Sequence, residues 1–179
     1  MADIPPVKLI AAVLYQSEKA LEKAYGIMAE TFSTIDFKGD CLPFVESDYY
    51  GPEMGSDLLR GIISFERLVN PGSLASLKLQ ARALEDRLRN AEGRTVNIDI
   101  GYLDMFKVVL ASFKARSNKI YLSDGVWADW IMYFESGEYQ TFLWSFPDFK
   151  SGIYDPALKS IRNRYKTQLK AVKQTRRHS

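Results

Sequence analysis

The chain has 179 residues, of which 46% are hydrophobic and 26% charged, and this composition and length predict a single folded domain over residues 1–179. It holds one histidine, His178, and one cysteine, Cys41, so zinc sites built from several Cys and His ligands are excluded. We likewise expect no haem and no iron–sulfur centre. A lone cysteine forms no internal disulfide, and the apolar run at residues 9–15 is far shorter than the roughly 20 residues that cross a bilayer. We expect a soluble, cytoplasmic protein without a membrane contact.

The net charge of +2 conceals an uneven distribution along the chain. Eight basic residues and no acidic residue follow Asp155, which leaves 16 basic against 22 acidic residues before that point. A basic end of this kind, over residues 159–177, is typical of a segment that binds RNA or an acidic protein partner. The simpler interpretation is a solvated helix face and tail that dock onto the acidic body.

The first third of the chain alternates between strand and helix signals. Residues 7–15 are almost all apolar, as expected of a strand covered on both faces. Ser17 is a candidate N-cap for a helix whose apolar residues repeat at helical spacing, namely Leu21, Tyr25, Met28 and Phe32. A second strand is predicted over residues 35–44, with an interruption at 38–40, and a third over residues 58–68.

A second helix follows a break at residues 70–73. Its apolar residues have the cleanest helical period in the protein: Leu74, Leu77, Ala81, Leu84 and Leu88. Gly93 ends this helix, and residues 95–100 then alternate strictly between polar and apolar, as a strand does. The order strand, helix, strand, strand, helix, strand is that of a ferredoxin-like fold. We therefore predict an α+β fold with a ferredoxin-like core over about residues 7–103, both helices lying on one face of the sheet.

The remaining residues are predicted to extend this core. Residues 107–113 fit a strand or a helical turn equally well, whereas 119–122, 126–135 and 139–144 read as strands joined by turns. A last helix begins at Asp155-Pro156, and its apolar stripe consists of Leu158, Ile161, Tyr165, Leu169 and Val172. We expect an antiparallel β extension and a C-terminal helix over about residues 104–172, then a basic tail over 173–179.

The familiar nucleotide and hydrolase motifs are absent. The sequence contains no G-x-x-x-x-G-K-[ST] phosphate loop, no G-x-G-x-x-G after a strand and no G-x-S-x-G elbow. The Asn-Lys-x-Asp motif that reads guanine is missing too, because Asn118-Lys119 is followed by Ile120-Tyr121. Neither a Walker site nor a Rossmann site is supported.

Polar and aromatic residues gather in four segments, at residues 47–53, 64–67, 97–104 and 144–149. If the helices cover the face that carries Phe65 and Ile98, strand alternation places Ser64, Glu66, Asn97 and Asp99 on the opposite face. Because aromatic residues such as Trp130 and Trp144 follow, we expect the later strands to curl over this face. A polar hollow under an aromatic cover would be a small-ligand site.

Two carboxylates are the candidates for chemistry in that hollow. Asp99 and Glu66 are suited to bind Mg²⁺ or to act as a general base, with basic residues facing an anion. The candidate ligand-binding residues are Asn97, Asp99, Tyr102, Ser64, Glu66, Arg67, Lys114, Asp48 and Tyr49. The alternative is that Asn97 and Asp99 are merely the solvated side of an amphipathic strand.

Five motifs occur in one order: Asp48-Tyr49-Tyr50 with Glu53-Met54-Gly55, Ser64 to Leu68, Asn97-Ile98-Asp99-x-Gly101-Tyr102-Leu103, Lys119-Ile120-Tyr121-Leu122-x-x-Gly125, and Phe146-Pro147-Asp148-Phe149. In this the chain resembles a prokaryotic family known as domain of unknown function 4416, over about residues 7–165. It departs from the family pattern at Ile100, where Pro is expected, and at Asn118, where His is expected. The resemblance implies a prokaryotic protein without an established activity. Some members are labelled GTP-binding, a label that the motifs of this chain do not support.

Two functional hypotheses follow from the sequence. The first is a pocket for a small anionic, phosphorylated or nucleotide-like ligand over the sheet. The second is a non-catalytic interaction module that uses the basic last helix. Association of two copies through an uncovered sheet edge is a third alternative, and whether the protein is an enzyme stays open.

Overall fold

The computed structural model describes residues 4–44, 54, 57–91, 93–116 and 118–177. In the first half of the chain the main elements are β1 (Val7–Tyr15), α1 (Glu18–Thr31), β2 (Ile35–Lys38), β3 (Leu42–Pro43), β4 (Leu59–Val69), a 3-10 turn η1 (Pro71–Ser73) and α3 (Leu74–Arg87). In the second half they are β5 (Val96–Leu103), β6 (Lys107–Ser112), β7 (Lys119–Ser123), β8 (Val126–Glu135), β9 (Glu138–Thr141), α4 (Pro147–Lys150) and α5 (Asp155–Arg177).

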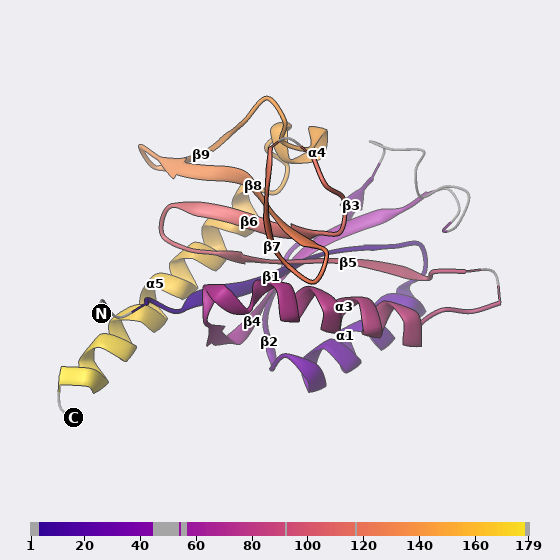
Figure 1. The fold of residues 1–179 in the computed structure, drawn as a ribbon, viewed down its shortest axis with the longest axis horizontal. Coiled ribbons are helices and arrows are strands. Elements are labelled where there is room, and N and C mark those ends of the chain that lie inside the picture. Colours follow the sequence, from indigo (N-terminus) through magenta and orange to yellow (C-terminus); the bar gives the residue numbers. More distant parts are fainter. Residues whose placement is uncertain (1–3, 45–53, 55–56, 92, 117, 178–179) are drawn as a thin grey trace.

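The strands of the described residues form one mixed-length antiparallel sheet in the order β2-β4-β1-β5-β6-β8-β7. Two short strands lie beside this path: β3 pairs with β4, and β9 pairs with β8. Helices cover both faces, with α1 and α3 side by side on one face and α5 crossing the other (Figure 1). The protein therefore has the mixed α and β architecture predicted from the sequence.

The first face of the sheet carries the larger apolar core. Alternate residues of β1, among them Leu9, Ala11 and Val13, point toward α1 and α3 and are 1% exposed or less. Phe65 of β4 is completely buried here, with its ring edge-on to Phe32 at a centroid distance of 5.4 Å. The alternation of strand side chains and the helical spacing in α1 and α3 thus meet in one apolar layer.

The second face of the sheet is covered by α5. Ile10 and Ala12 of β1 pack with Leu158, Ile161 and Tyr165 of the helix, all of them buried. Strands β6, β8 and β7 continue the sheet beyond β5 and do not fold over this face as we expected. Tyr139 of β9 and Phe149 of α4 nevertheless pack in the same layer, so α5 shares the cover of this face with the segment that follows β8.

Several element boundaries match the sequence signals. The N-cap of α1 is Ser17, whose Oγ accepts the N–H of Ala20 at 3.4 Å, and Asn70 caps the turn that leads into α3. The ambiguous segment 107–113 is a strand, β6. The predicted strand at 139–144 ends at Thr141, because the Phe142 N–H bonds to the Ser145 side chain instead of to a strand. None of the helices described is both long and apolar enough to cross a membrane.

A glycine marks the place where the sheet begins to divide. At Gly101 the neighbouring strand comes so close that a Cβ atom would lie 2.3 Å from the carbonyl oxygen of Val109. Strands β5 and β6 pair only from this residue to Leu103, with Gly101 opposite Leu110. The preceding residues of β5 therefore have no strand beside them on that side, and this gap positions the candidate site.

Candidate functional site

A cavity of about 730 Å³ lies where β5 and β6 separate. Its walls come from β5, from one side of α3, from the segment 110–119 and from residues 144–148. The volume lies within the roughly 300–1,000 Å³ typical of small-molecule sites. The sequence segments that form it are far apart in the chain, so the cavity exists only in the folded protein.

Two side chains of α3 replace the missing strand beside β5. The N–H of Ile98 donates to Oε1 of Glu85 at 2.5 Å, and Nζ of Lys78 donates to the carbonyl oxygen of Ile98 at 3.0 Å. Both α3 side chains are buried, and burial raises the pKa of Glu85 against the opposing effect of Lys78. The backbone N–H and C=O of Ile98 therefore have hydrogen-bond partners, although no strand lies beside this part of β5.

Arg60 of β4 joins two carboxylates at the floor of the cavity. Its guanidinium donates to Asp148 at 2.7 Å and to Asp99 at 3.1 Å, and the hydroxyl of Tyr154 donates to Asp148 at 3.1 Å. Burial opposes the charge on Arg60, yet the carboxylates of Asp99 and Asp148 outweigh it and raise the pKa of the guanidinium. The arrangement ties α4 to β4 and β5.

The pKa of Asp99 is lowered for a related reason. Burial alone would raise it, but the cations of Lys78, 3.6 Å away, and of Arg60 favour the ionised form more strongly. Asp99 is therefore a stable carboxylate held between two cations. Such a group is a weak proton acceptor, because a general base works best when its pKa lies near the working pH.

A second set of paired groups lies on the opposite wall. Lys119 donates to Asp129 at 3.1 Å and to the hydroxyl of Ser112 at 2.9 Å, and the amide of Asn118 donates to Asp129 at 3.0 Å. The side chains of Lys119 and Asp129 are each 5% exposed. Asn118 thus serves here as an amide donor to a buried carboxylate.

The charges that line the cavity are predominantly positive. Eight lining residues are basic and five are acidic, an excess of three positive charges. The buried cations are paired with carboxylates as described above. The exposed charged residues around the cavity are Arg82, Arg89, Lys114 and Arg116, with Asp86 as their acidic neighbour. The excess charge therefore lies where a ligand would enter.

Two buried donors belong to residues that line the cavity and have no hydrogen-bond acceptor within 3.5 Å, although the side chain of Asn97 lies near enough to Asp99 to lower the pKa of that carboxyl. The structure describes three buried side-chain polar atoms without a hydrogen-bond partner, and two of them, Nε of Arg60 and Nδ2 of Asn97, belong to cavity residues. Each of these two residues is 4% exposed. Arg94 donates to Oδ1 of Asn97 at 2.8 Å, which fixes the amide with its NH₂ group away from Arg94. Unpaired buried donors are costly, so they need an explanation.

Three of the predicted site residues line this cavity: Asn97, Asp99 and Lys114. Others lie elsewhere on β4. Ser64 donates to Asp36 at 2.6 Å beneath α5, and the backbone carbonyl of the exposed Glu66 accepts from Gln168 at 2.6 Å. Glu66 thus stands with the end of α5 and not with Asp99, although strand alternation gives both the same face.

The remaining predicted residues do not meet at the cavity either. Arg67 is exposed, and its backbone N–H donates to Ser33. Tyr102 is partly buried against the α1 and α3 face, where burial raises the pKa of its hydroxyl. Asp48 and Tyr49 lie outside the described residues. Among the residues described, no group of three His, Cys, Asp or Glu side chains is placed to hold a metal ion.

Sequence reasoning did not single out the α3 residues. Lys78 and Glu85 flank the apolar stripe of the helix, seven residues apart and therefore on the same side of it. Charged residues at the border of an apolar stripe, next to a strand that loses its neighbour, are a usable signal. Arg60 has a similar signal, since it is a lone cation in the buried part of β4.

We compared the sequence of this chain with models of protein families. The family model described as domain of unknown function (DUF4416) matches residues 5–165. The chain belongs to the DUF4416 family. No curated protein and no solved structure matched it.

Two of the motifs that carry the resemblance to DUF4416 meet in the cavity. Asp99 comes from the motif Asn97-Ile98-Asp99-x-Gly101, and Asp148 comes from Phe146-Pro147-Asp148-Phe149. Arg60 bonds both carboxylates. The chain segments most distinctive in sequence are thus joined in space by one guanidinium.

Proposed function

We propose that this DUF4416 protein binds a small anionic ligand, phosphorylated or nucleotide-like, in the cavity between β5, α3 and the segment 110–119. The observation that carries the proposal is the pair of buried donors, Nε of Arg60 and Nδ2 of Asn97, on two residues that line this cavity. A ligand oxygen would supply the missing acceptor. Phosphate oxygens suit this role, because they accept several charge-assisted hydrogen bonds at once.

The distribution of charge supports an anion over a cation. Three of the five carboxylates that line the cavity are engaged by protein cations: Asp99 and Asp148 by Arg60, and Asp129 by Lys119. A metal ion entering this site would have to displace those cations. The exposed arginines and lysine at the cavity instead raise the local concentration of anions.

The proposal is one of binding and leaves catalysis aside. Asp99, the strongest candidate for a general base, has a lowered pKa and lies between Lys78 and Arg60. Glu66, the other candidate, lies with α5. Neither predicted carboxylate therefore has the properties of a proton acceptor in this cavity, and the geometry favours recognition of a ligand.

The fold is part of the proposal. We interpret β1, α1, β2, β4, α3 and β5 as a ferredoxin-like core, since these strands lie in the order β2-β4-β1-β5 and are antiparallel throughout. The cavity would then lie at the border between this core and the added strands. A cytoplasmic location fits the single cysteine, which cannot form a disulfide within the chain.

Calorimetric titration of the full chain tests the proposal, with inorganic triphosphate, ATP and GTP as probes. At least one probe should bind, and at 100 times its Kd it should stabilise the protein against unfolding by about 2.7 kcal/mol. If none of the three binds to the folded protein, the proposal is wrong.

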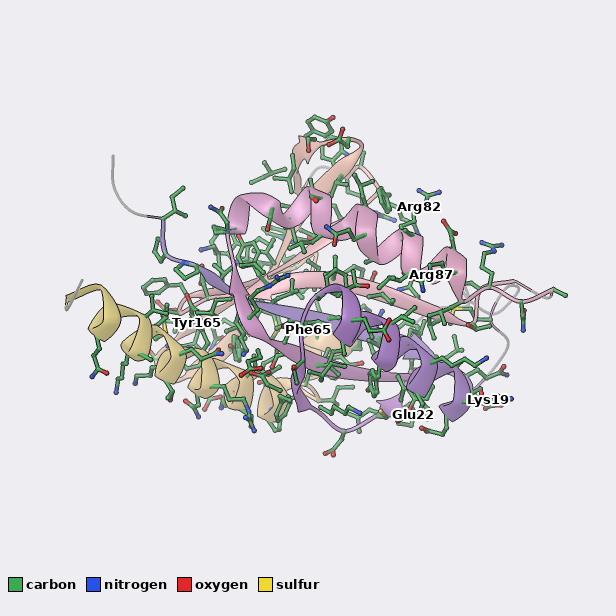
Figure 2. All side chains as sticks on the ribbon, turned by 90° about the horizontal axis from the view of Figure 1, so that it is seen from below. Lys19, Glu22, Phe65, Arg82, Arg87 and Tyr165 are labelled. Carbon is green, nitrogen blue, oxygen red and sulfur yellow. The ribbon has the colours of Figure 1, made fainter. Side chains whose placement is uncertain are left out.

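Two arginines of α3 provide a matched comparison (Figure 2). Both are exposed, but Arg82 lines the cavity and Arg87 does not. Arg82→Gln should weaken binding of the successful probe about tenfold, the value of one charge-assisted hydrogen bond, and Arg87→Gln should leave it unchanged. Equal effects of the two substitutions would show that general surface charge, and not this cavity, attracts the probe.

The alternative function, in which the basic last helix binds RNA or an acidic partner, stays a prediction. Leu158, Ile161 and Tyr165 belong to the core. A variant without residues 159–179 would therefore unfold, and its loss of RNA binding could not be assigned to the basic residues. The exposed residues Lys166 and Lys170 offer a cleaner test. Replacing both with Glu should abolish RNA binding in a filter assay if this alternative is correct.

A further inference from the structure

Strand β7 (Lys119–Ser123) forms one end of the sheet. On one side it pairs with β8, with Tyr121 opposite Trp127, and among the described strands none pairs with its other side. An edge strand of this kind presents a row of backbone N–H and C=O groups to a further strand.

The side chains of β7 make this edge unusual. Ile120, Tyr121 and Leu122 are 69%, 54% and 40% exposed, three consecutive large apolar residues. The charged residue of the strand, Lys119, points inward to Asp129 and does not protect the edge. Proteins normally blunt exposed edges with charges, bulges or a covering segment, and β7 carries one such feature, an irregularity in its pairing with β8 between Tyr121 and Ser123.

The other edge strands follow that normal pattern. At the opposite end of the sheet, β2 carries the exposed Lys38 within its four residues. Strand β9, beside β8, carries the exposed residues Glu138 and Gln140. The apolar exposure is therefore specific to β7 among the edges that the structure describes.

We propose that β7 is a dimerisation edge, which pairs in antiparallel fashion with β7 of a second copy of this chain. The sequence of the strand is complementary to itself in that arrangement. With Tyr121 of each copy on the two-fold axis, Ile120 of one copy lies beside Leu122 of the other, at the irregularity that follows Tyr121. Every apolar residue of the strand then gains an apolar neighbour.

The charges at the two ends of β7 favour the same partner. The exposed Asp124 follows one end of the strand and the exposed Arg116 precedes the other. Antiparallel pairing brings the acidic end of one copy beside the basic end of the other, twice per dimer. A parallel arrangement would place like charges together, and an unrelated strand would match these ends only by chance.

The length of β7 sets the strength of the dimer. Five residues bury much less than the roughly 800 Å² per partner of a standard stable interface. We therefore expect a reversible dimer with a Kd in the micromolar range.

Sedimentation velocity of the full chain over a series of concentrations tests the pairing. The wild type should shift from monomer to dimer as concentration rises. The double variant Ile120→Lys with Leu122→Lys should remain monomeric at every concentration, because it places two pairs of lysines face to face. Leu79→Lys with Leu143→Lys adds the same charge at exposed leucines elsewhere and should dimerise like the wild type.

Cross-linking tests the register of the strands. In a Cys41→Ser background, Tyr121→Cys should form a disulfide-linked dimer under mild oxidation at least tenfold faster than Leu143→Cys, whose side chain is 93% exposed on a loop. A wild type that stays monomeric would overturn self-pairing and point to a strand of another protein as the occupant. A lysine double variant that still dimerises, or equal cross-linking rates, would overturn the assigned edge.

Discussion

The two sides of β5 differ in how their polar groups find hydrogen-bond partners. Toward β1, the strand is paired along its whole length, from Val96 opposite Tyr15 to Leu103 opposite Lys8. Toward β6, it is paired over three residues, and the rest of the edge meets charged side chains of α3 and a cavity. On the side toward β1, which we call the closed side, the backbone groups of β5 pair with those of β1 and need no ligand as a partner.

On the side toward β6, which we call the open side, two specific hydrogen-bond donors lack an acceptor. Its carboxylates and most of its cations are paired, and Ile98 has partners for both backbone groups. Arg60 and Asn97 nevertheless keep buried donors without an acceptor. In our proposal, oxygen atoms of a bound ligand are the acceptors for these two donors. The following substitutions compare the stability that the apolar layer contributes with the stability that charged groups on the open side contribute.

The largest loss of stability is expected in the apolar layer. Phe65→Ala removes a completely buried ring that packs against Phe32, and it should lower the free energy of unfolding by about 3–5 kcal/mol. Urea denaturation measures this. Phe106→Ala, at a residue that is 72% exposed, is the control and should cost less than about 1 kcal/mol. The folded fraction of the Phe65 variant should bind the probe as the wild type does.

A loss of about 3 kcal/mol is expected for Asp99→Asn at neutral pH, because the substitution removes a carboxylate held by Lys78 and Arg60. The folded pKa of Asp99 lies below its ordinary value of 3.8, so its stabilisation is present above pH 3.8 and is lost as the pH falls below that value. Urea denaturation of both proteins at several pH values should show the difference shrinking in acid.

The control for this pH series is Asp86→Asn, an equal change of charge at an exposed position of α3. It should alter stability by no more than about 0.5 kcal/mol at any pH. A difference between wild type and the Asp99 variant that stays constant down to the acid end would contradict the ion-pair account.

The smallest effects on stability are expected where side chains of α3 bond to the backbone of Ile98 in β5. Glu85→Ala leaves the N–H of Ile98 without its acceptor and should cost about 1–3 kcal/mol. Glu85→Gln keeps an acceptor oxygen and removes a charge that burial already disfavours, so it should cost less than about 1 kcal/mol. Thermal unfolding of the two variants side by side measures the difference. Equal losses would mean that the charge of Glu85, not its hydrogen bond, supports the edge.

Much of the fold was predictable because its signals are local. The alternation in β4 and β5 and the helical period of α3 fix which side chains face the core, and these were confirmed. Ser17 as the N-cap of α1 was confirmed for the same reason. What covers the second face was not predictable, because the choice between α5 and the later strands depends on how the sheet continues after β5.

The candidate site was predictable only in part. Asn97 and Asp99 follow from strand alternation, and they line the cavity. Glu66 has the same alternation but stands apart, since the pairing of β4 with β1 is irregular between Lys8 and Ile10 and since β4 runs on beneath α5. The alternation of side chains tells on which face of a sheet a residue lies, but it does not tell how far apart two residues on that face are. Nor can it reveal that Lys78 and Glu85 reach across from a helix.

The most direct test of the central claim uses the amide of Asn97. Titration calorimetry with inorganic triphosphate should show binding to the wild type and to Asn163→Asp, an equal change of charge at an exposed residue of α5. Asn97→Asp replaces the unpaired NH₂ donor by a carboxylate oxygen and should weaken binding at least about tenfold, or 1.4 kcal/mol, while the variant stays folded. Undiminished binding by a folded Asn97→Asp protein would contradict the account.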